Sequence, residues 1–305
     1  MKHFVQVSGA YSLAVPPLLQ ANDGPCYVHS IFKNGWNIRC GSGLIFIGSR
    51  KNGELPFGIH LEDDLVPWLI SLLSMEETVL YDRDASVLLF SSFCIKLDSS
   101  QAHDCQITSM KASAEDLLLG LDAFALELCT NNESTGTGIL VSHFIECFIS
   151  EVESSYSEHE HKVIQLMDAA QSECLPHIDE TLRYWIGRGN GLTPTGDDML
   201  SGMLAVDTVA GIFTDKFRLH LSELIEREAL TTDISLEYLR YGLRGQFSSV
   251  ISNVLNGLTL EDREELIKRT HELLCVGRSS GLDTAFGILL GMLIIRRNPI
   301  WHRKS

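Results

Sequence analysis

The sequence lacks the cysteine spacings that mark a zinc site or a redox pair. Eight cysteines lie at positions 26, 40, 94, 105, 129, 147, 174 and 275, and none forms a CxxC pair. Several fall inside apolar patterns, where a free thiol behaves as a small hydrophobic side chain. We therefore expect reduced core thiols in a cytoplasmic protein.

Long apolar runs and common catalytic signatures are also missing. The longest apolar run, residues 285–295, is interrupted by Gly287 and Gly291 and is shorter than the roughly 20 residues that span a bilayer. The first residues show no clean apolar segment before a cleavage site, so we expect no signal peptide and no membrane partner. HExxH, GxSxG and GxxxxGK[ST] motifs do not occur, which leaves metalloprotease, hydrolase-elbow and phosphate-loop chemistry without support.

Positive charge is scarce. The chain has 24 Lys and Arg against 40 Asp and Glu, a formal net charge of −16. This charge repels phosphate backbones and anionic membranes, so we expect no nucleic-acid partner. A small anionic ligand must be held by a local site that works against the overall field.

The residues that are present fall into two compositions. Up to about residue 108, short β-type segments alternate with turn residues such as Asn34-Gly35. Beyond it, apolar residues recur at helical spacing, as at Leu117, Leu121, Phe124 and Leu128. We predict strands at 27–33, 36–40, 44–48, 78–81, 87–90 and 93–97, and a short helix at 64–74. Further helices are predicted from Ser113 and at 138–152, 158–174, 177–186, 198–213, 216–230, 235–243, 247–256, 261–275 and 282–296.

These patterns predict an α+β protein. Residues 1–108 are expected to form a small antiparallel β barrel or sandwich, and residues 109–305 an all-α domain. A glycine-rich segment at 187–202, GRGNGLTPTGDDMLSG, interrupts the helical pattern and opens a helix. The amides at such a helix start suit an anion. Its GxGxG spacing after a helix is not a dinucleotide fingerprint.

This segment has a short internal copy. Residues 195–204 align without gaps with residues 280–289, and the shared pattern is Ser/Thr, Gly, any residue, Asp, three residues, Gly, any residue, Leu. In one interpretation, Thr195 and Ser280 are N-caps whose capping boxes are completed by Asp198 and Asp283.

A second interpretation makes the pair of helix starts a ligand site. If the two helices cross at Gly202 and Gly287, both N-termini and their carboxylates face one pocket. The candidate anion-binding residues share small side chains and a place at one of the two starts: Gly189, Asn190, Gly191, Thr193, Thr195, Gly196, Ser279, Ser280 and Gly281. Asp197 and Asp198 are also candidate ligands of Mg²⁺, the one cofactor that the sequence suggests. Arg188 and Arg278 flank the loops and are weaker candidates.

The octapeptide at 191–198, GLTPTGDD, resembles the GLTP[ST]GDD hallmark of a bacterial family. This AllH-like family, long treated as a domain of unknown function, includes a subunit of oxamate carbamoyltransferase from anaerobic allantoin breakdown. Further matches run along the chain in order: residues 28–32, Asn37, residues 56–59, 231–235, 238–239 and 279–284.

The resemblance implies reversible carbamoyl transfer between phosphate and oxamate, with oxalurate as the carbamoylated form. It also implies a multi-subunit enzyme, and therefore other protein subunits besides the small anionic substrates, carbamoyl phosphate and oxamate. Asp197, Asp198 and Asp283 become the candidate catalytic residues, which position a metal or the carbamoyl NH₂, a hydrogen-bond donor.

Two alternatives stay open. The chain could be a non-catalytic scaffold or ligand-sensing subunit. It could also be a metal-dependent phosphate-handling enzyme related to carboxylases, because older labels for some relatives of the family call them carboxylases.

Overall fold

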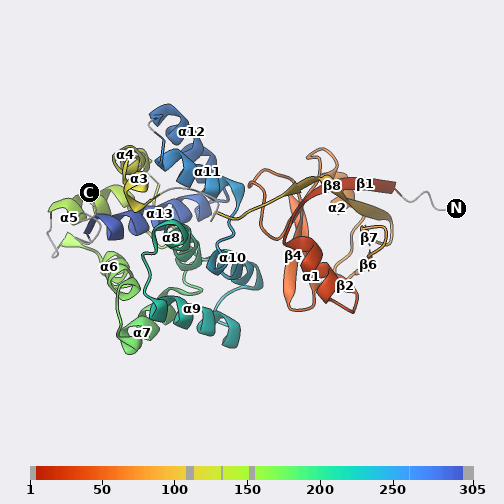
Figure 1. Ribbon diagram of the computed structural model, residues 1–305, viewed down its shortest axis with the longest axis horizontal. Coiled ribbons are helices and arrows are strands. Elements are labelled where there is room, and N and C mark those ends of the chain that lie inside the picture. Colours follow the sequence, from red (N-terminus) through yellow and green to blue (C-terminus); the bar gives the residue numbers. More distant parts are fainter. Residues whose placement is uncertain (1–4, 108–112, 132, 151–154, 261, 298–305) are drawn as a thin grey trace. The chain divides into compact units, whose positions relative to one another are not determined.

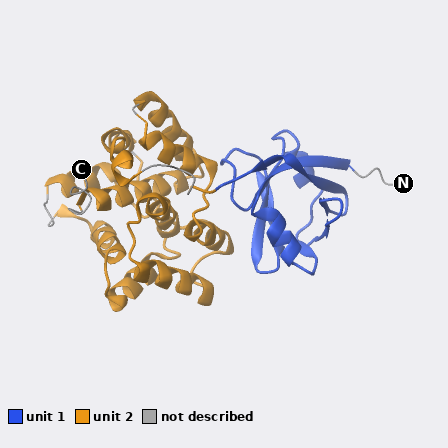
Figure 2. Ribbon diagram, viewed as in Figure 1, with its two compact units in different colours: residues 1–105 blue, residues 106–305 orange. Residues whose placement is uncertain are grey.

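The computed structural model describes residues 5–107, 113–131, 133–150, 155–260 and 262–297. The chain divides into two compact units, residues 1–105 and 106–305 (Figure 2). The boundary predicted between residues 108 and 109 lies outside the described residues. So do the predicted helix end at 152 and the predicted helix start at 261.

The first unit is a closed barrel (Figure 1). Its strands are β1 (Val5–Ser12), β2 (Cys26–Phe32), β3 (Gly35–Cys40), β4 (Gly43–Gly48), β5 (Gly58–His60), β6 (Thr78–Asp82), β7 (Val87–Leu89) and β8 (Phe93–His103). They pair in the order β1-β5-β4-β3-β2-β6-β7-β8, and β1 also pairs with β8 in parallel, which closes the sheet. Since β4 and β5 pair in parallel as well, the expectation of a purely antiparallel sheet is wrong for these two pairs. Two short helices, α1 (Val15–Ala21) and α2 (Val66–Ile70), belong to this unit.

The strands predicted from β-branched and aromatic residues are confirmed, although β8 runs six residues beyond its predicted end at 97. The short strand β5, the helix α1 and the strand β1 were not predicted. In β1 the alternating pattern is weakened by Gly9, whose position is crowded: a Cβ there would lie 2.7 Å from Cγ2 of Ile59. A glycine in a strand often marks such a close approach.

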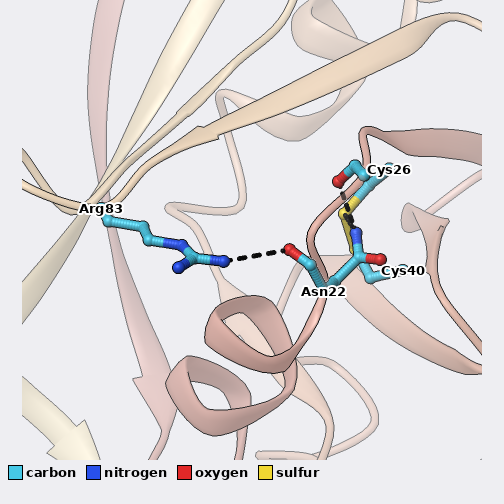
Figure 3. Close-up of a disulfide and its surroundings, with 5 residues drawn as sticks. Asn22, Cys26, Cys40 and Arg83 are labelled. Carbon is cyan, nitrogen blue, oxygen red and sulfur yellow. Dashed lines mark hydrogen bonds between the residues drawn. A yellow bond between two sulfur atoms is a disulfide. The ribbon is translucent and has the colours of Figure 1, made fainter.

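Cys26 and Cys40 form a disulfide across the β2–β3 hairpin (Figure 3). The expectation that all eight cysteines are reduced is therefore wrong for this pair. The antiparallel register sets Tyr27 opposite Arg39, which places Cys26 opposite Cys40 with their Cα atoms 4.5 Å apart, within disulfide reach. Asn22 donates to Cys26 Sγ at 3.6 Å and joins this corner to the end of α1. The other six cysteines are free.

The second unit is helical. Its helices are α3 (Ala114–Leu118), α4 (Leu121–Thr130), α5 (Val141–Ser150), α6 (Glu158–Ala170), α7 (Leu175–Trp185), α8 (Thr195–Ala210), α9 (Asp215–Arg227), α10 (Asp233–Leu243), α11 (Ser249–Leu258), α12 (Arg263–Leu274) and α13 (Ser280–Arg297). The predicted start at Ser113 is confirmed as a capping box with Asp116. Where this unit is described, β structure is limited to the isolated bridges Gln106↔Gln246 and Ser134↔Leu140. The α+β class is confirmed.

Helices α8 and α13 form the centre of this unit (Figure 1). Both are buried along nearly their whole length, as expected for helices with apolar residues on all sides. They cross at the two predicted glycines. A Cβ on Gly202 would lie 2.2 Å from the Thr284 carbonyl oxygen, and a Cβ on Gly287 2.1 Å from the Met199 carbonyl oxygen. None of the described helices is both long and apolar enough to cross a membrane.

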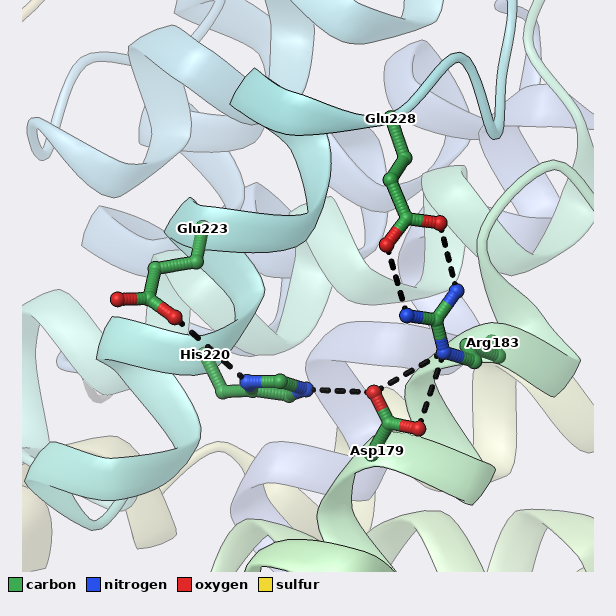
Figure 4. Close-up of polar contacts among 5 residues, drawn as sticks. All are labelled: Asp179, Arg183, His220, Glu223 and Glu228. Carbon is green, nitrogen blue, oxygen red and sulfur yellow. Dashed lines mark hydrogen bonds and ion pairs between the residues drawn. The ribbon is translucent and has the colours of Figure 1, made fainter.

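A polar cluster joins α7 to α9 and to Glu228, the residue after α9 (Figure 4). Arg183 donates to both carboxylate oxygens of Glu228 at 2.7 Å and to Asp179 at 3.0 Å. His220 lies 2.7 Å from the same Asp179, and its hydrogen bond is the main reason that the pKa of Asp179 is lowered. Since α7 leads into the glycine-rich loop and α9 into residues 228–232, the cluster fixes two stretches that meet at Asp197.

Candidate functional site

The two helix starts meet at one cavity of about 900 Å³. Its lining consists mainly of small polar residues from three segments: Glu133, Ser134, Thr135, Gly136, Asn190, Gly191, Leu192, Thr193, Arg278, Ser279 and Ser280. The hydroxyls of Thr193 and Ser280, one from each start, are hydrogen-bonded at 2.8 Å. The predicted meeting of the two starts is therefore confirmed.

The capping boxes predicted within each helix are wrong. Helix α8 begins after Pro194, which makes no side-chain cap, and Ser280 is already the first residue of α13. The hydroxyls near each carboxyl include one from the opposite helix start: Ser280 lies near Asp198, and Thr195 lies near Asp283. This arrangement follows from the close crossing, because glycines at the contact let the two starts approach each other.

Both aspartates are buried: Asp198 is 8% exposed and Asp283 is 1% exposed. Burial raises the pKa of Asp198 well above its usual value, and the neighbouring Asp283 raises it further. Burial also raises the pKa of Asp283, against the Gly136 amide and the Ser279 and Thr195 hydroxyls. Within the described residues, Oδ2 of each carboxyl has no hydrogen-bond partner. Such unpaired buried oxygens are rare and call for an explanation.

The loop before α5 completes the site and was missed in the sequence. The Gly136 amide donates to Oδ1 of Asp283 at 2.9 Å. A Cβ on Gly136 would lie 2.3 Å from Oγ1 of Thr195 and 3.2 Å from Oδ2 of Asp283. Only a glycine therefore fits against both helix starts. The available signal was the small polar run at residues 134–138, STGTG.

Asp197 is directed away from the cavity. Its Oδ1 accepts from the Gly187 amide at 2.9 Å, and its Oδ2 accepts from the hydroxyls of Ser235 at 2.7 Å and of Thr231. Burial raises the pKa of Asp197, against these three bonds. The structure thus gives Asp197 a position that ties the glycine-rich loop to the start of α10.

Two of the predicted anion donors are already occupied. The Gly196 amide donates to the Arg188 carbonyl and the Gly281 amide to the Val276 carbonyl, each at 2.9 Å. Both glycines are instead needed for packing, since a Cβ on either would lie 2.0 Å from a carbonyl oxygen of the preceding helix. Gly189, with φ of 121°, backs onto the Thr195 amide.

The predicted site residues therefore fall into three groups. Those that line the cavity are Asn190, Gly191, Thr193, Ser279 and Ser280. Directly behind them lie Thr195, Asp198 and Asp283. Asp197, Gly189, Gly196 and Gly281 hold the loops in place. Of the two flanking arginines, Arg278 lines the cavity, whereas Arg188 stacks on the Tyr184 ring with its guanidinium carbon 3.8 Å from the centroid.

A metal centre finds little support. The described part of the chain contains no group of three or more His, Cys, Asp or Glu side chains that could hold a metal ion. Of the two carboxyls behind the cavity lining, Asp198 has hydroxyls as neighbours, and Asp283 has hydroxyls and the Gly136 amide.

The chain thus combines a barrel with a helical unit, in which two glycine-aspartate helix starts lie around one polar cavity. The model of the AllH family N-terminal domain matches residues 9–103, and the model described as oxamate carbamoyltransferase subunit AllH matches residues 185–292. The chain belongs to the AllH family. No solved structure matches it.

Proposed function

We propose that this chain is a subunit of an oxamate carbamoyltransferase and that the cavity between α8 and α13 holds the reacting small molecules. The family match supports the activity, since its description names this enzyme. The observation that carries the site is the pair of buried carboxyls, each with an unpaired oxygen, directly behind a wall of hydroxyls.

The reaction exchanges one bond at the carbamoyl carbon. In the catabolic direction a phosphate oxygen forms a bond to that carbon of oxalurate, and the bond from the carbon to the oxamate nitrogen breaks. The proton of hydrogen phosphate ends on the departing nitrogen. The products are carbamoyl phosphate and oxamate, so atoms and charge balance without a redox step.

The chain's own groups match the needs of this exchange. Arg278, on the cavity wall, supplies a positive charge for the anionic ends of the reactants. A carboxyl such as Asp198, whose raised pKa keeps its proton to higher pH, can supply and recover a proton through the Ser280 and Thr193 hydroxyls. Positioning and charge stabilisation then lower the barrier, as expected for transfer between anions.

The test is phosphate-dependent breakdown of oxalurate, followed by the appearance of oxamate. It should be measured with the purified chain alone and with the other subunits of the assembly. We expect turnover only in the assembly, and its loss in Asp198→Asn. Absence of turnover in every combination would contradict the proposed activity.

A ligand-sensing or scaffold role is the second candidate. One observation favours it: the amides of Gly196, Asp197 and Asp198 at the start of α8 are all bonded within the chain. In that case the assembly would retain full turnover when Asp198 is replaced by Asn, while phosphate and oxamate would still bind in a calorimetric titration.

A further inference from the structure

Helices α4 and α5 each have two apolar faces. A helix at the surface of a globular unit usually buries one apolar stripe and leaves polar residues on its other side. Helix α4 buries Phe124 and Leu128 in the core, but its Leu126 is 65% exposed. Helix α5 buries Phe144, but its Ile149 is 69% exposed. Packing of the core therefore explains one apolar face of each helix and does not explain the other.

Both of these second faces line one apolar groove of about 470 Å³, to which α13 contributes buried residues. Each helix supplies lining residues three or four positions apart: Leu126 and Cys129 from α4, Ile145 and Ile149 from α5, and Leu289 and Leu293 from α13. Residues at this spacing lie on one face of a helix, so the groove follows the helix axes. Its lining on α13 extends from Leu289 to Arg297, about 12 Å at the rise of an α-helix.

One end of the groove is basic. Arg296 and Arg297, the last residues of α13, line this end. The guanidinium carbon of Arg297 lies 4.9 Å from the centroid of the Phe148 ring, which holds the positive charge against the apolar lining. The ion pair of Arg297 with Asp168 is 3.6 Å long, and its side chains are 49% and 61% exposed. Because such an exposed pair contributes little, a carboxylate of an occupant can replace it.

The exposed rims of the groove decide the size of its occupant. An apolar small molecule such as a fatty acid would fill the groove but leave Leu126 and Ile149 in water. A helix of a protein partner covers these side chains as well, and its residues at i, i+3 or i+4, and i+7 span about 10 Å, which fits the groove. Contiguous exposed apolar side chains are typical of such protein interfaces.

The charge of the groove favours a different subunit over a second copy of this chain. In an isologous dimer both copies present the same surface, so each would bring its two arginines into one interface. A different chain can supply carboxylates instead. The family description names a subunit of a larger enzyme, so other chains are expected beside this one.

We propose that the groove between α4, α5 and α13 binds an amphipathic helix of another subunit of the assembly. This helix presents apolar residues at i, i+3 or i+4, and i+7, and a carboxylate at the end that meets Arg296 and Arg297. The surface is distinct from the polar cavity, since the cavity is lined by Ser280 at the start of α13 and the groove by residues from Leu289 onward. The inference rests on the proposed function only in requiring that the chain works beside other subunits.

The test measures binding of the full chain to the other subunits of the assembly, expressed together without it, by calorimetric titration. Leu126→Asp and Ile149→Asp place a charge on the rims and should each weaken binding by about 30-fold or more. Leu219→Asp is the matched control, because Leu219 on α9 is also 65% exposed and does not line the groove. This control should bind as the wild type does.

A second pair of variants tests the basic end and covers failure of the first pair to fold, which a thermal melt would reveal. Arg297→Glu should weaken binding by about tenfold, whereas Arg297→Lys keeps the charge and should retain most of the affinity. No binding by the wild-type chain, or unchanged binding by Leu126→Asp, Ile149→Asp and Arg297→Glu, would overturn the inference.

A photoreactive residue in place of Leu126 identifies the occupant. A cross-link to a segment of another subunit with the stated apolar spacing and carboxylate would support the inference. A cross-link to a second copy or to residues 298–305 of the same chain, or a lipid retained in the native mass spectrum, would overturn it. Oxalurate breakdown by assemblies that contain the Asp variants at full affinity would remove the docking surface and leave the proposed function standing. Binding that is lost in these variants, with no breakdown by the wild-type assembly, would do the opposite.

Discussion

The two aspartates that follow Gly196 are adjacent in the sequence but belong to two different regions of the protein. On one side, Asp197 joins the glycine-rich loop to the start of α10, and both of its oxygens are bonded to donors from the chain. On the other side, Asp198 faces α13 and Asp283, and one of its oxygens has no partner where the chain is described. A buried carboxylate with all its bonds made stabilises a loop, whereas one with a bond left open is available to a ligand or a proton.

The largest effect on activity should come from a change at Asp198, the aspartate with an unpaired oxygen. Replacing Asp198 by Asn removes a transferable proton but keeps the shape, so kcat/KM of the assembled enzyme for oxalurate phosphorolysis should fall by about 100-fold or more. Binding of oxamate should survive, which separates chemistry from recognition. Asp122→Asn makes the same change on an α4 side chain that is 92% exposed, so it serves as the control and should leave turnover unchanged. A fully active Asp198→Asn enzyme would contradict the distinction between the two aspartates.

The next test moves α13 away from α8 without touching either aspartate. Gly287→Val places a side chain against the Met199 carbonyl, where even a Cβ would lie at 2.1 Å. The variant should lose roughly 3 kcal/mol of unfolding free energy or more, measured by chemical denaturation. Gly24→Ala, at a position where a Cβ would meet no atom within 4 Å, should cost little. Equal stability of the two variants would show that the crossing is not tight.

A change at Asp197, whose two oxygens are both hydrogen-bonded, should affect stability rather than chemistry. Asp197→Ala leaves the Gly187 amide and two hydroxyls without their acceptor, which should lower the unfolding free energy by about 2 to 3 kcal/mol. The folded variant should bind oxamate as the wild type does. Lost binding at full stability would place Asp197, rather than Asp198, at the ligand.

The smallest effect concerns pH. The pKa of Asp198 is raised in the folded state, so between its ordinary and its raised value the folded protein holds a proton that the unfolded chain has released. The resulting stability is complete below the ordinary value and is lost as pH rises through the raised one. Asp198→Asn cannot titrate, so its advantage in unfolding free energy over the wild type should grow with rising pH. Parallel pH profiles for the two proteins would contradict this.

Much of the site was predictable because its residues are unusual for their position. The GLTPTGDD segment and its copy at residues 280–289 contain more glycine and aspartate than a helix start requires, and the shared spacing predicted a crossing at Gly202 and Gly287. The direction of each carboxylate was not predictable. Asp197 and Asp198 differ by one helical step of about 100°, and which step faces α13 depends on the packing of the whole unit.

Contacts between residues far apart in the chain were not predictable for a related reason. Gly136 lies 147 residues from Asp283, whose carboxyl its amide contacts, and no local pattern encodes that contact. The disulfide between Cys26 and Cys40 depends on the register of β2 against β3, which the spacing of cysteines along the chain does not show. The strands and helices themselves were predictable where apolar residues recur at a regular period.

The closure of the barrel has a consequence for the order of folding. The first strand, β1, pairs with the last, β8, from Val5 opposite Phe93 to Ser12 opposite His103. This pairing joins residues far apart in the chain, and such contacts form late because a long loop must close first. During synthesis the edge of β1 that pairs with β8 therefore stays unpaired until β8 has left the ribosome. The barrel can close only when its last strand is available.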